Sequence, residues 1–509
     1  VTDNFTLNLG LRADNTIYLD DPRTDRFFND TAAAAISQYY DLRGARSGQM
    51  TDPKWSINPR IGFTYKIEDE GITIRGGLGT FTGRVPLVWP GGVYNQNGVS
   101  IAGLNRSNVE FRPDPLGQYS LQDFGLSARL PSGEVNLIAK DFRLNKVFRT
   151  SLGVDKNLNN GWKLSVEGVF TKNINEIAYQ QVNILPPTTK SVGADVRNVY
   201  SLSGNFPKNI PMRADGSNPY TGVYLLYNND DKKGFAYNFT FTIDKAWRNG
   251  FAFNANYTYG NSVVMNEGTS SQNSSQWRYM ETVNGRNYMP RSISDFDIAH
   301  RINAYVAKKI TYANKFLATT FSLVYNGQSG SPYSYVMGRG MVRDFDNNED
   351  NDLIYVPRSS SEIRFVQNGT VTPEQQWNLF NTFIENDDYL KNRRGQYAER
   401  NGARLPFTHV VDLKIQQDFN IRIARKNYQF QITYDVFNFT NMLNRDWGRQ
   451  YWATNDNYRI LDFVGYVSAT DLTPTYRFTQ PADGKPYTVS DGAFNSSRWS
   501  SQLGIRFNF

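Results

Sequence analysis

The chain ends in the stretch Trp499-Ser500-Ser501-Gln502-Leu503-Gly504-Ile505-Arg506-Phe507-Asn508-Phe509, in which apolar and polar residues alternate. From Leu503 onward every odd position is apolar, whereas Arg506 and Asn508 occupy even positions. Successive side chains of a β-strand point to opposite faces, so this stretch predicts a strand with one apolar face and one polar face. A half-buried strand of a soluble protein shows the same alternation, and the rest of the chain has to separate the two cases.

The same alternation recurs in about eleven further segments, each about ten residues long and many of them rich in aromatic residues. These segments are 4–12, 57–67, 72–82, 146–155, 162–171, 235–243, 251–259, 301–310, 316–326, 410–419 and 428–436. We therefore predict an all-β chain that forms about twelve strands of one transmembrane antiparallel β-barrel. The residues expected to face lipid are Phe251, Phe253, Tyr257 and Leu503, and the residue expected to face the lumen is Arg506.

The connections between these segments alternate between short turns and long polar loops. The short turns are 68–71, 157–161, 248–250, 311–315 and 420–427, and the long loops are 13–56, 83–145, 172–234, 261–298, 327–408 and 437–498. Outer-membrane barrels keep short turns on the periplasmic side and long loops outside, and every connection here fits that rule. The aromatic last residue also resembles the carboxy-terminal signal of bacterial outer-membrane proteins. The pattern therefore predicts long extracellular loops.

Composition agrees with a barrel and argues against several other classes. The mean hydropathy is -0.56 and 20% of the residues are charged, which resembles a soluble protein. Only alternate residues of a barrel strand meet lipid, so hydropathy averages do not reveal such a wall. The net charge of +7 comes from basic residues scattered among 48 acids, and we expect no nucleic-acid partner. The start at Val1 predicts that the chain is the back part of a longer polypeptide.

Motifs for bond chemistry are nearly absent, so we predict that the chain is not an enzyme and has no catalytic residues. There is no nucleophile elbow, phosphate loop or zinc-binding pair of histidines in the sequence. The two histidines, His300 and His409, each begin a predicted strand. We expect both rings in the girdle where a barrel strand crosses the membrane interface.

One acidic loop has the spacing of a cation site. Its candidate ligands for calcium are Asp344, Asp346, Asn348, Asp350 and Asp352. Alternate oxygens on a tight turn can converge on a hard cation such as Ca²⁺. The loop departs from an EF-hand, because Glu349 stands at the position of the turn glycine and Tyr355 at that of the bidentate glutamate. A solvated acidic turn is the alternative.

Aromatic residues are frequent in the long loops. The stretches 89–97 and 447–458 combine aromatic and asparagine side chains, which predicts either binding of a sugar or peptide or packing between loops. The loop 327–408 holds many bulky side chains, among them Tyr333, Trp377 and Phe380. A disordered loop is poor in such residues, so we expect this loop to fold into a compact cap.

Five motifs resemble a known family. They are Asn351–Pro357 (NDLIYVP), Arg400–Pro406 (RNGARLP), Val411–Phe419 (VDLKIQQDF), Asp435–Asn441 (DVFNFTN) and Asn58–Tyr65 (NPRIGFTY). As a set they resemble the Oar-like TonB-dependent receptors of Bacteroidetes and related bacteria, over most of the chain. The resemblance implies a barrel of about twenty-two strands, of which residues 1–509 form the carboxy-terminal part. It also implies a plug domain carrying a TonB box, which this sequence does not contain.

These observations together predict a transporter in the outer membrane of a Gram-negative bacterium that imports a large or scarce substrate. The implied partners are outer-membrane lipid, the TonB-ExbB-ExbD system acting through the plug, and a surface lipoprotein or other outer-membrane protein. The only cofactor considered is Ca²⁺. An alternative is a barrel subunit of a larger outer-membrane assembly, with the loops as its docking surface. A third, an open diffusion porin, is disfavoured by the family motifs.

Overall fold

The computed structural model describes residues 3–84, 86–101, 107–120, 122–125, 133–202, 208–231, 233–344, 351–423, 426–481, 483–489 and 497–509. One large sheet dominates it, and each segment predicted from the alternation falls in one strand of that sheet. The strands along the sheet, in order, are β1 (Phe5–Thr16), β2 (Lys54–Ile67), β3 (Ile72–Thr82), β5 (Lys146–Asn157), β6 (Trp162–Gln181), β10 (Phe235–Arg248), β11 (Phe251–Val264), β13 (His300–Tyr312), β14 (Leu317–Gln328), β21 (Thr408–Ile423), β22 (Lys426–Phe437) and β27 (Ser500–Asn508). Every neighbouring pair on this path is antiparallel.

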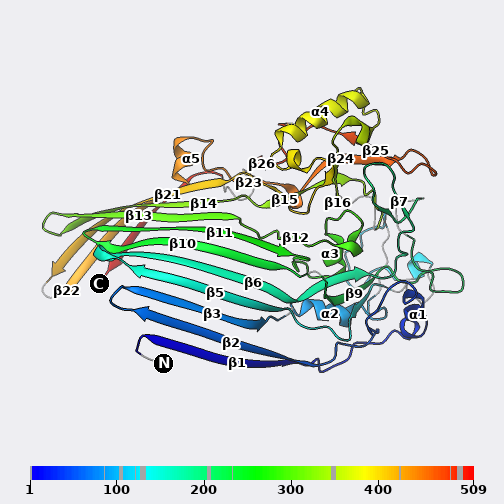
Figure 1. Cartoon of the computed structure of the whole chain (residues 1–509), viewed down its shortest axis with the longest axis horizontal. Coiled ribbons are helices and arrows are strands. Elements are labelled where there is room, and N and C mark those ends of the chain that lie inside the picture. Colours follow the sequence, from blue (N-terminus) through cyan, green and yellow to red (C-terminus); the bar gives the residue numbers. More distant parts are fainter. Residues whose placement is uncertain are drawn as a thin grey trace.

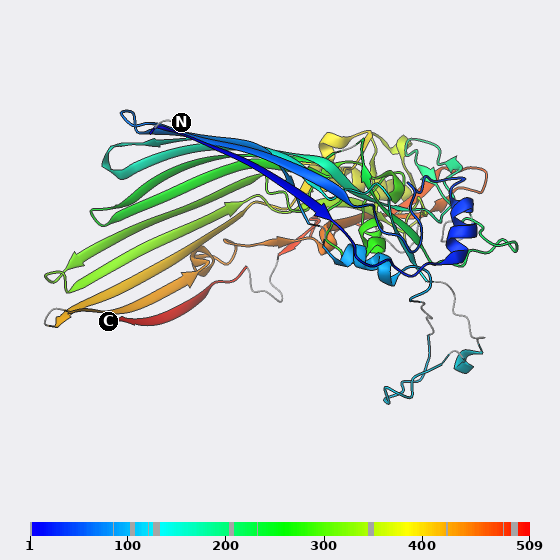
Figure 2. The same ribbon diagram turned by 90° about the horizontal axis from the view of Figure 1, so that it is seen from below.

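These twelve strands form a curved wall that is not closed into a barrel. Among the described residues, β1 pairs with β2 alone and β27 with β22 alone, so each is an edge of the sheet. The two chain ends lie at the same end of the wall, together with the tight turns (Figures 1 and 2). The long connections gather at the opposite end, as the turn and loop lengths predict.

The turn between β10 and β11 shows how the sequence determines the strand register. Arg248 pairs directly with Phe251, so only Asn249 and Gly250 form the turn. Both have positive φ, 53° and 69°, which is the type I′ geometry favoured by the right-handed twist of a hairpin. An asparagine and a glycine adopt that conformation at low cost, and the predicted hairpin is confirmed.

The wall has one apolar and one polar face. A row of direct partners runs from Phe251 through Lys308, Phe321, Ile415 and Tyr434 to Leu503. Direct cross-strand partners share a face, so Phe251 and Leu503 lie on the same side of the wall. Arg506 pairs with Gln431, which pairs with Asp418 on the other side. The predicted separation of Leu503 from Arg506 is therefore confirmed.

Ion pairs and hydrogen bonds cover the polar face. Lys309 contacts Asp418 at 3.1 Å, and Gln416 and Gln431 donate to the same carboxylate at 2.9 and 2.8 Å. Further along the wall, Arg75 bridges Glu167 at 2.6 Å and Asp155 at 3.3 Å. Arg75 sits on β3, Asp155 on β5 and Glu167 on β6, so these contacts tie neighbouring strands together in addition to the backbone ladder.

The strands are longer than the predicted segments of about ten residues. β6 has 20 residues, and its final segment, Glu176 to Gln181, pairs with β9 (Val223–Asn229), a strand of the following long loop. Ala178, Tyr179 and Gln181 are buried there, so both faces of the extension are covered and the alternation is lost. A criterion based on alternation therefore ends the strand too early.

The long loops fold into helices and short strands. The helices are α1 (Ala33–Ile36), α2 (Val88–Asn95), α3 (Asn273–Arg278), α4 (Pro373–Asn386) and α5 (Phe439–Leu443), with short helical turns at Phe28–Ala32, Gln122–Phe124, Asn159–Gly161, Arg286–Tyr288, Ser360–Glu362, Leu390–Arg393 and Thr454–Asp456. The short strands are β4 (Val135–Ile138), β7 (Thr189–Lys190), β8 (Asn198–Val199), β9 (Val223–Asn229), β12 (Ser292–Ile293), β15 (Pro332–Gly338), β16 (Asp352–Leu353), β17 (Tyr355–Val356), β18 (Arg364–Phe365), β19 (Gln396–Tyr397), β20 (Ala403–Arg404), β23 (Tyr451–Trp452), β24 (Asn457–Tyr466), β25 (Pro474–Phe478) and β26 (Thr488–Val489). No helix in the described part of the chain is long and apolar enough to cross a membrane.

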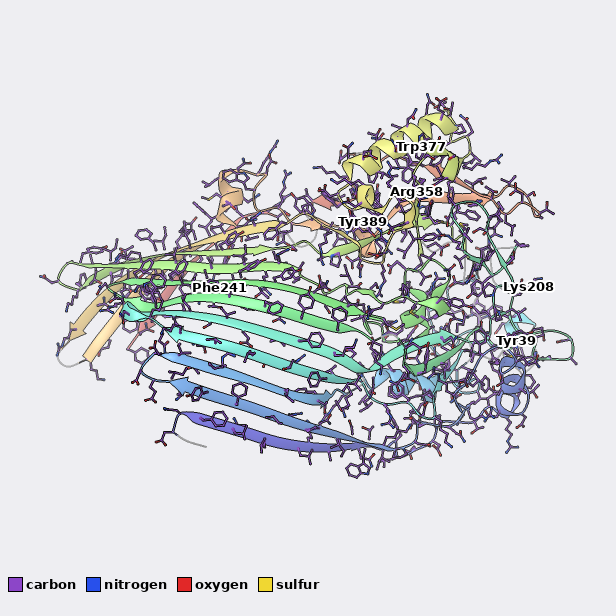
Figure 3. The ribbon with its side chains drawn as sticks, viewed as in Figure 1. Tyr39, Lys208, Phe241, Arg358, Trp377 and Tyr389 are labelled. Atoms are coloured by element: carbon purple, nitrogen blue, oxygen red, sulfur yellow. The ribbon has the colours of Figure 1, made fainter. Side chains whose placement is uncertain are left out.

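Two apolar cores organise these loops. The first, here called the α1 lobe, centres on Phe28, Leu137, Leu225 and Trp277. It draws on the first four long loops and on Val342 of the fifth. The second, the α4 lobe, centres on α4 and combines the loop 327–408 with residues 453–478. Figure 3 shows Trp377 and Tyr389 in the α4 lobe and Tyr39 in the α1 lobe. The predicted folding of 327–408 into a compact cap is confirmed.

The sequence of α4 explains why a helix forms in the middle of this loop. The Thr372 hydroxyl caps its amino terminus by accepting a hydrogen bond from the Gln375 backbone nitrogen. The Thr372 backbone nitrogen in turn donates to the Gln375 side-chain oxygen. Pro373 follows at the first helical position, where no backbone donor is needed. Phe380 and Ile384, one turn apart, are fully buried against the α4 lobe. The amphipathic spacing and the capping box together place the helix.

Candidate binding site

Three long loops meet at the junction above the wall. Thr282, from the loop after β11, donates to the Asn351 carbonyl and accepts from Leu353, both at 3.0 Å. β15 of the loop 327–408 also pairs in parallel with β24, so the last long loop, 437–498, lies next to the loop 327–408. These backbone pairings are long-range, so the junction is held by the fold of the loops as a whole.

An open cavity of about 890 Å³ lies at this junction. It is lined by Tyr279, Glu281, Val336, Asn351, Trp452, Ala453, Thr454, Asn455, Asn457, Tyr458, Arg459, Pro481, Asp483, Lys485, Pro486, Tyr487 and Thr488. A pocket of this size with aromatic walls and a few polar groups has the usual make-up of a ligand site.

Local structure presents the aromatic walls of this cavity. Trp452 belongs to β23, which pairs with β26, and its side chain is 53% exposed. Tyr279 ends α3 on the opposite loop and is 62% exposed. Exposed rings of this size are costly to leave in water, and stacking a ligand against them would remove that cost.

The carboxyl group of Glu281 is the most perturbed acid of the cavity. Burial raises its pKa to about 7, a change that the charge of Arg400 and a hydrogen bond with Asn457 partly oppose. Asn457 begins β24, so strand pairing holds its amide next to the acid. This acid with a raised pKa therefore lies in the cavity wall.

One of the two basic side chains of the wall already has an acidic partner. Arg459 bonds to Asp462 at 2.5 Å, three residues further along β24. Lys485 lies 6.0 Å from the centre of the Tyr487 ring, and Asp483 is two residues away on the same segment.

The predicted calcium ligands are divided by the fold. Asp346, Asn348 and Asp350 lie outside the described residues. Asp344 is buried and forms an ion pair with Arg286, whose backbone nitrogen also donates to it at 2.6 Å. Asp352 is buried too and accepts from the Val342 nitrogen at 2.9 Å.

The two described aspartates therefore already have protein partners. Burial raises the pKa of Asp352 to about 6, against the opposing charge of Arg197. Within the described residues, no three acidic or histidine side chains gather as a metal site. Calcium binding by Asp344 to Asp352 remains a prediction.

Both histidines lie on the wall where the strands meet the loops. The Nδ1 atom of His300 is 2.8 Å from the Tyr257 hydroxyl, and that of His409 is 2.8 Å from the Tyr325 hydroxyl. Each histidine thus pairs with a tyrosine of the neighbouring strand, and both rings are exposed. Tyrosine and histidine rings of this kind suit an interface between apolar and aqueous layers.

The aromatic loops flagged from the sequence take different roles. Trp89 of α2 is buried, and its ring nitrogen donates to the Ser270 carbonyl at 2.8 Å, so 89–97 contributes to loop packing. Trp452 and Tyr458 of the stretch 447–458 line the cavity instead. Sequence reasoning missed Glu281 and Tyr279, because nothing in their local sequence distinguishes them from ordinary loop residues.

Comparisons with known proteins place these features in a family. A family model described as an outer membrane beta barrel domain matches residues 1–449. A search of curated proteins returned no match. Among solved structures, the outer membrane transporter YddB from Escherichia coli shares 10% identity at a TM-score of 0.40, over 89% of this chain and 41% of YddB.

Two further solved structures are similar at the same level. The siderophore receptor PirA from Acinetobacter baumannii shares 12% identity at a TM-score of 0.35, over 99% of this chain and 44% of PirA. The FrpB iron transporter from Neisseria meningitidis shares 10% identity at a TM-score of 0.38, over 87% of this chain and 40% of FrpB. The chain therefore spans less than half the length of each.

The match to the family model covers most of the chain, and the wall has the alternating faces and the segregated turns and loops of a barrel. Its apolar face is accordingly the one that meets lipid. The chain belongs to the outer membrane beta barrel domain family and resides in the outer membrane of a Gram-negative bacterium.

Proposed function

We propose that the chain is the carboxy-terminal wall and loop portion of a TonB-dependent transporter, which imports a large or scarce substrate captured by its loops. The observation that carries this proposal is the cavity of about 890 Å³ at the junction of three folded loops. A connection between two strands needs only a few residues, whereas these loops build cores and an open pocket. The wall then serves as the passage and the loops as the capture site.

The polar face of the wall supports a hydrated passage. The ladder from Arg75 to Glu167 and the cluster around Asp418 line the face opposite to the lipid. Charged and amide side chains on the lumen side of a barrel interact with water and polar solutes at little cost. A substrate too polar to cross lipid could therefore pass along this side of the sheet.

The finer parts of the proposal rest on the motif resemblance. We assign the chain to the Oar-like subtype of Bacteroidetes, within a complete barrel of about twenty-two strands. In that arrangement further strands would pair with the edges β1 and β27, and residues 1–509 would form one part of a single barrel domain. A plug domain would occupy the lumen and couple substrate capture to TonB-ExbB-ExbD.

The test uses the natural full-length polypeptide in its native host. Deleting 361–395 removes all of α4 and should abolish substrate uptake while the wall still inserts into the outer membrane. Trp452→Ala is the finer variant, because its exposed side chain supports the cavity and no lobe core. Uptake that continues unchanged in both variants would show that the α4 lobe and the cavity are not the capture site.

A second candidate function is that of a docking subunit in a larger outer-membrane assembly, with a surface lipoprotein or another outer-membrane protein as partner. The observation in its favour is the arm that holds residues 107–120 and 122–125, which projects from the loops in Figure 2. Phe111 and Leu116 on this arm are 84% and 95% exposed. The double variant Phe111→Ser/Leu116→Ser should lose a co-purifying partner, and retention of every partner would count against docking.

A further inference from the structure

A carboxylate without a basic partner stands in the wall of the loop cavity. Glu281 lines the cavity, and the Asn457 side chain acts on its carboxylate by lowering its pKa. Within the described residues it forms no ion pair, and the one cation that acts on it, Arg400, has partners of its own. Arg400 donates to the Ser292 hydroxyl and lies 3.9 Å from Glu267. A carboxylate removed from water with no counter-ion is costly, and a cationic ligand would offset that cost.

Two exposed rings of the same cavity are suited to a cation as well. Trp452 and Tyr279 present more than half of their surface, and both line the same cavity as Glu281. The face of an indole or phenol ring attracts a positive charge, most strongly where water is partly excluded. The chain itself illustrates this preference, because the Lys485 ammonium lies 6.0 Å from the centre of the Tyr487 ring in this cavity.

Two basic side chains, Arg459 and Lys485, also line the cavity. Arg459 is held by Asp462, and the Lys485 ammonium lies over the Tyr487 ring. An anionic ligand would meet the carboxylates of Glu281 and Asp483 with no unengaged arginine to receive it. A neutral sugar would find hydrogen bonds at Thr454 and Asn455 but would leave Glu281 without a counter-charge.

We propose that the cavity recognises a protonated primary amine on its ligand, placed between the Glu281 carboxylate and the rings of Tyr279 and Trp452. The ligand class is a small amine-bearing oligomer, either a lysine-containing peptide or an amino sugar. The proposal deepens the proposed function and rests on it, because it names the substrate chemistry of the same cavity. The ammonium supplies hydrogen bonds to the carboxylate and a cation for the rings.

The experiment measures binding to the full-length protein in a non-ionic detergent by titration calorimetry. The probes are two matched pairs: tetralysine with its ε-acetylated form, and the glucosamine tetramer with its N-acetylated form. Acetylation removes the charge of the modified amines in each pair. The titration is run at about pH 7, where the lysine ε-amines are charged and the sugar amines, whose pKa lies near that of an α-amino group, are largely protonated. We expect one amine form to bind about tenfold more tightly than its acetylated partner.

Variants assign the discrimination to this site. Glu281→Gln keeps the shape and the hydrogen bond to Asn457 but removes the charge, and should abolish the preference for the amine. Trp452→Ala, on an exposed ring that leaves the cores intact, should weaken amine binding by several-fold. Glu385→Gln, an exposed acid on α4, is the matched control and should change nothing.

The outcomes separate this inference from the proposed function. Equal binding of acetylated and free forms, no measurable binding of any probe, or a preference that survives Glu281→Gln would each overturn the inference. The preferred pair tells whether the amine is carried by a peptide or by a sugar. Uptake lost in Trp452→Ala while amines confer no preference would leave the transporter proposal standing and remove only the ligand class. Unchanged uptake in Trp452→Ala would instead count against the cavity as capture site.

Discussion

The wall and the loop lobes are two regions of one chain that are stabilised in opposite ways. In the wall, Leu503 is 69% exposed to its surroundings and contacts its neighbours mainly through the strand ladder. In the α4 lobe, Phe380 is fully buried and packs against Phe365 and Phe478. The apolar side chains of the wall are solvated by lipid, whereas those of the lobe are buried in protein. The wall therefore follows the physics of a membrane and the lobe that of a globular domain.

The treatment of charge differs in the same way. On the wall, Lys414 and Asp435 form a partly exposed pair between neighbouring strands, at 3.0 Å. In the loops, Arg197 and Asp195 are almost completely buried, and Tyr476 of the last long loop donates to Asp195 at 2.6 Å. Removing one member of a buried ion pair is costly, because the remaining charge is left without a counter-charge and without water. This network ties loop 172–234 to the α4 lobe.

The largest effect that would test this comparison is expected from Phe380→Ala. The change leaves a cavity in the α4 lobe and should destabilise the lobe by about 3–5 kcal/mol, while the wall still inserts. Limited proteolysis of the purified protein measures the stability of the lobe. The shift in electrophoretic mobility on heating measures whether the wall is folded. Leu379→Ala, on the exposed side of the same helix, is the control. A wall that fails to insert would show that the two regions fold as one unit.

The wall is tested by Leu503→Arg, which places a charge on the lipid-facing side of β27. We expect a loss of about 2–4 kcal/mol if the site lies near the midplane, because a guanidinium is poorly solvated by hydrocarbon. Unfolding in lipid vesicles by denaturant measures it. The adjacent Gln502→Arg lies on the polar face and should cost little. Equal losses from both variants would contradict the assignment of the two faces.

The loops should respond to pH through Glu281. Its pKa is about 7 in the folded protein and 4.5 ordinarily, so between these values the folded state holds more protons than the unfolded state. Stability of the surrounding loop should therefore fall as pH rises from about 4.5 to about 7, by at most about 1.4 kcal/mol per pH unit. Hydrogen exchange of residues 279–293 in the wild type and in Glu281→Gln, compared at each pH, measures the difference. If the exchange rates of the two proteins changed with pH in the same way, the pH dependence would not come from Glu281.

The smallest effect is expected at the boundary between the two regions. Tyr325→Phe removes the hydrogen bond to His409 and should cost about 0.5–1.5 kcal/mol, towards the lower limit because this hydrogen bond is exposed to solvent. Tyr305→Phe is the control, since the Tyr305 hydroxyl has no hydrogen bond within the described residues. Denaturant unfolding in vesicles gives both values. A larger cost than that of Leu503→Arg would place this pair in a structural role beyond the interface.

Much of the wall could be predicted from the sequence, because its determinants are local. Period-two alternation gives the strands and their faces, and the Asn249–Gly250 turn gives the register of a hairpin. Loop length alone predicted which end of the wall carries the long loops, and bulky residues such as Phe380 predicted that a loop would fold. Strand ends were missed where both faces are covered, as in Glu176 to Gln181 of β6.

The cavity was decided by tertiary structure. Tyr279, Glu281, Trp452 and Lys485 come from distant loops, and only pairings such as Thr282 with Asn351 and β15 with β24 bring them together. The perturbed acid is likewise invisible in the sequence, since a pKa shift depends on burial and on partners rather than on neighbours in the chain. The aromatic stretches 89–97 and 447–458 look alike as sequences, yet one is packed and the other lines the pocket. Local periodicity determined the wall, whereas long-range contacts between loops determined the site.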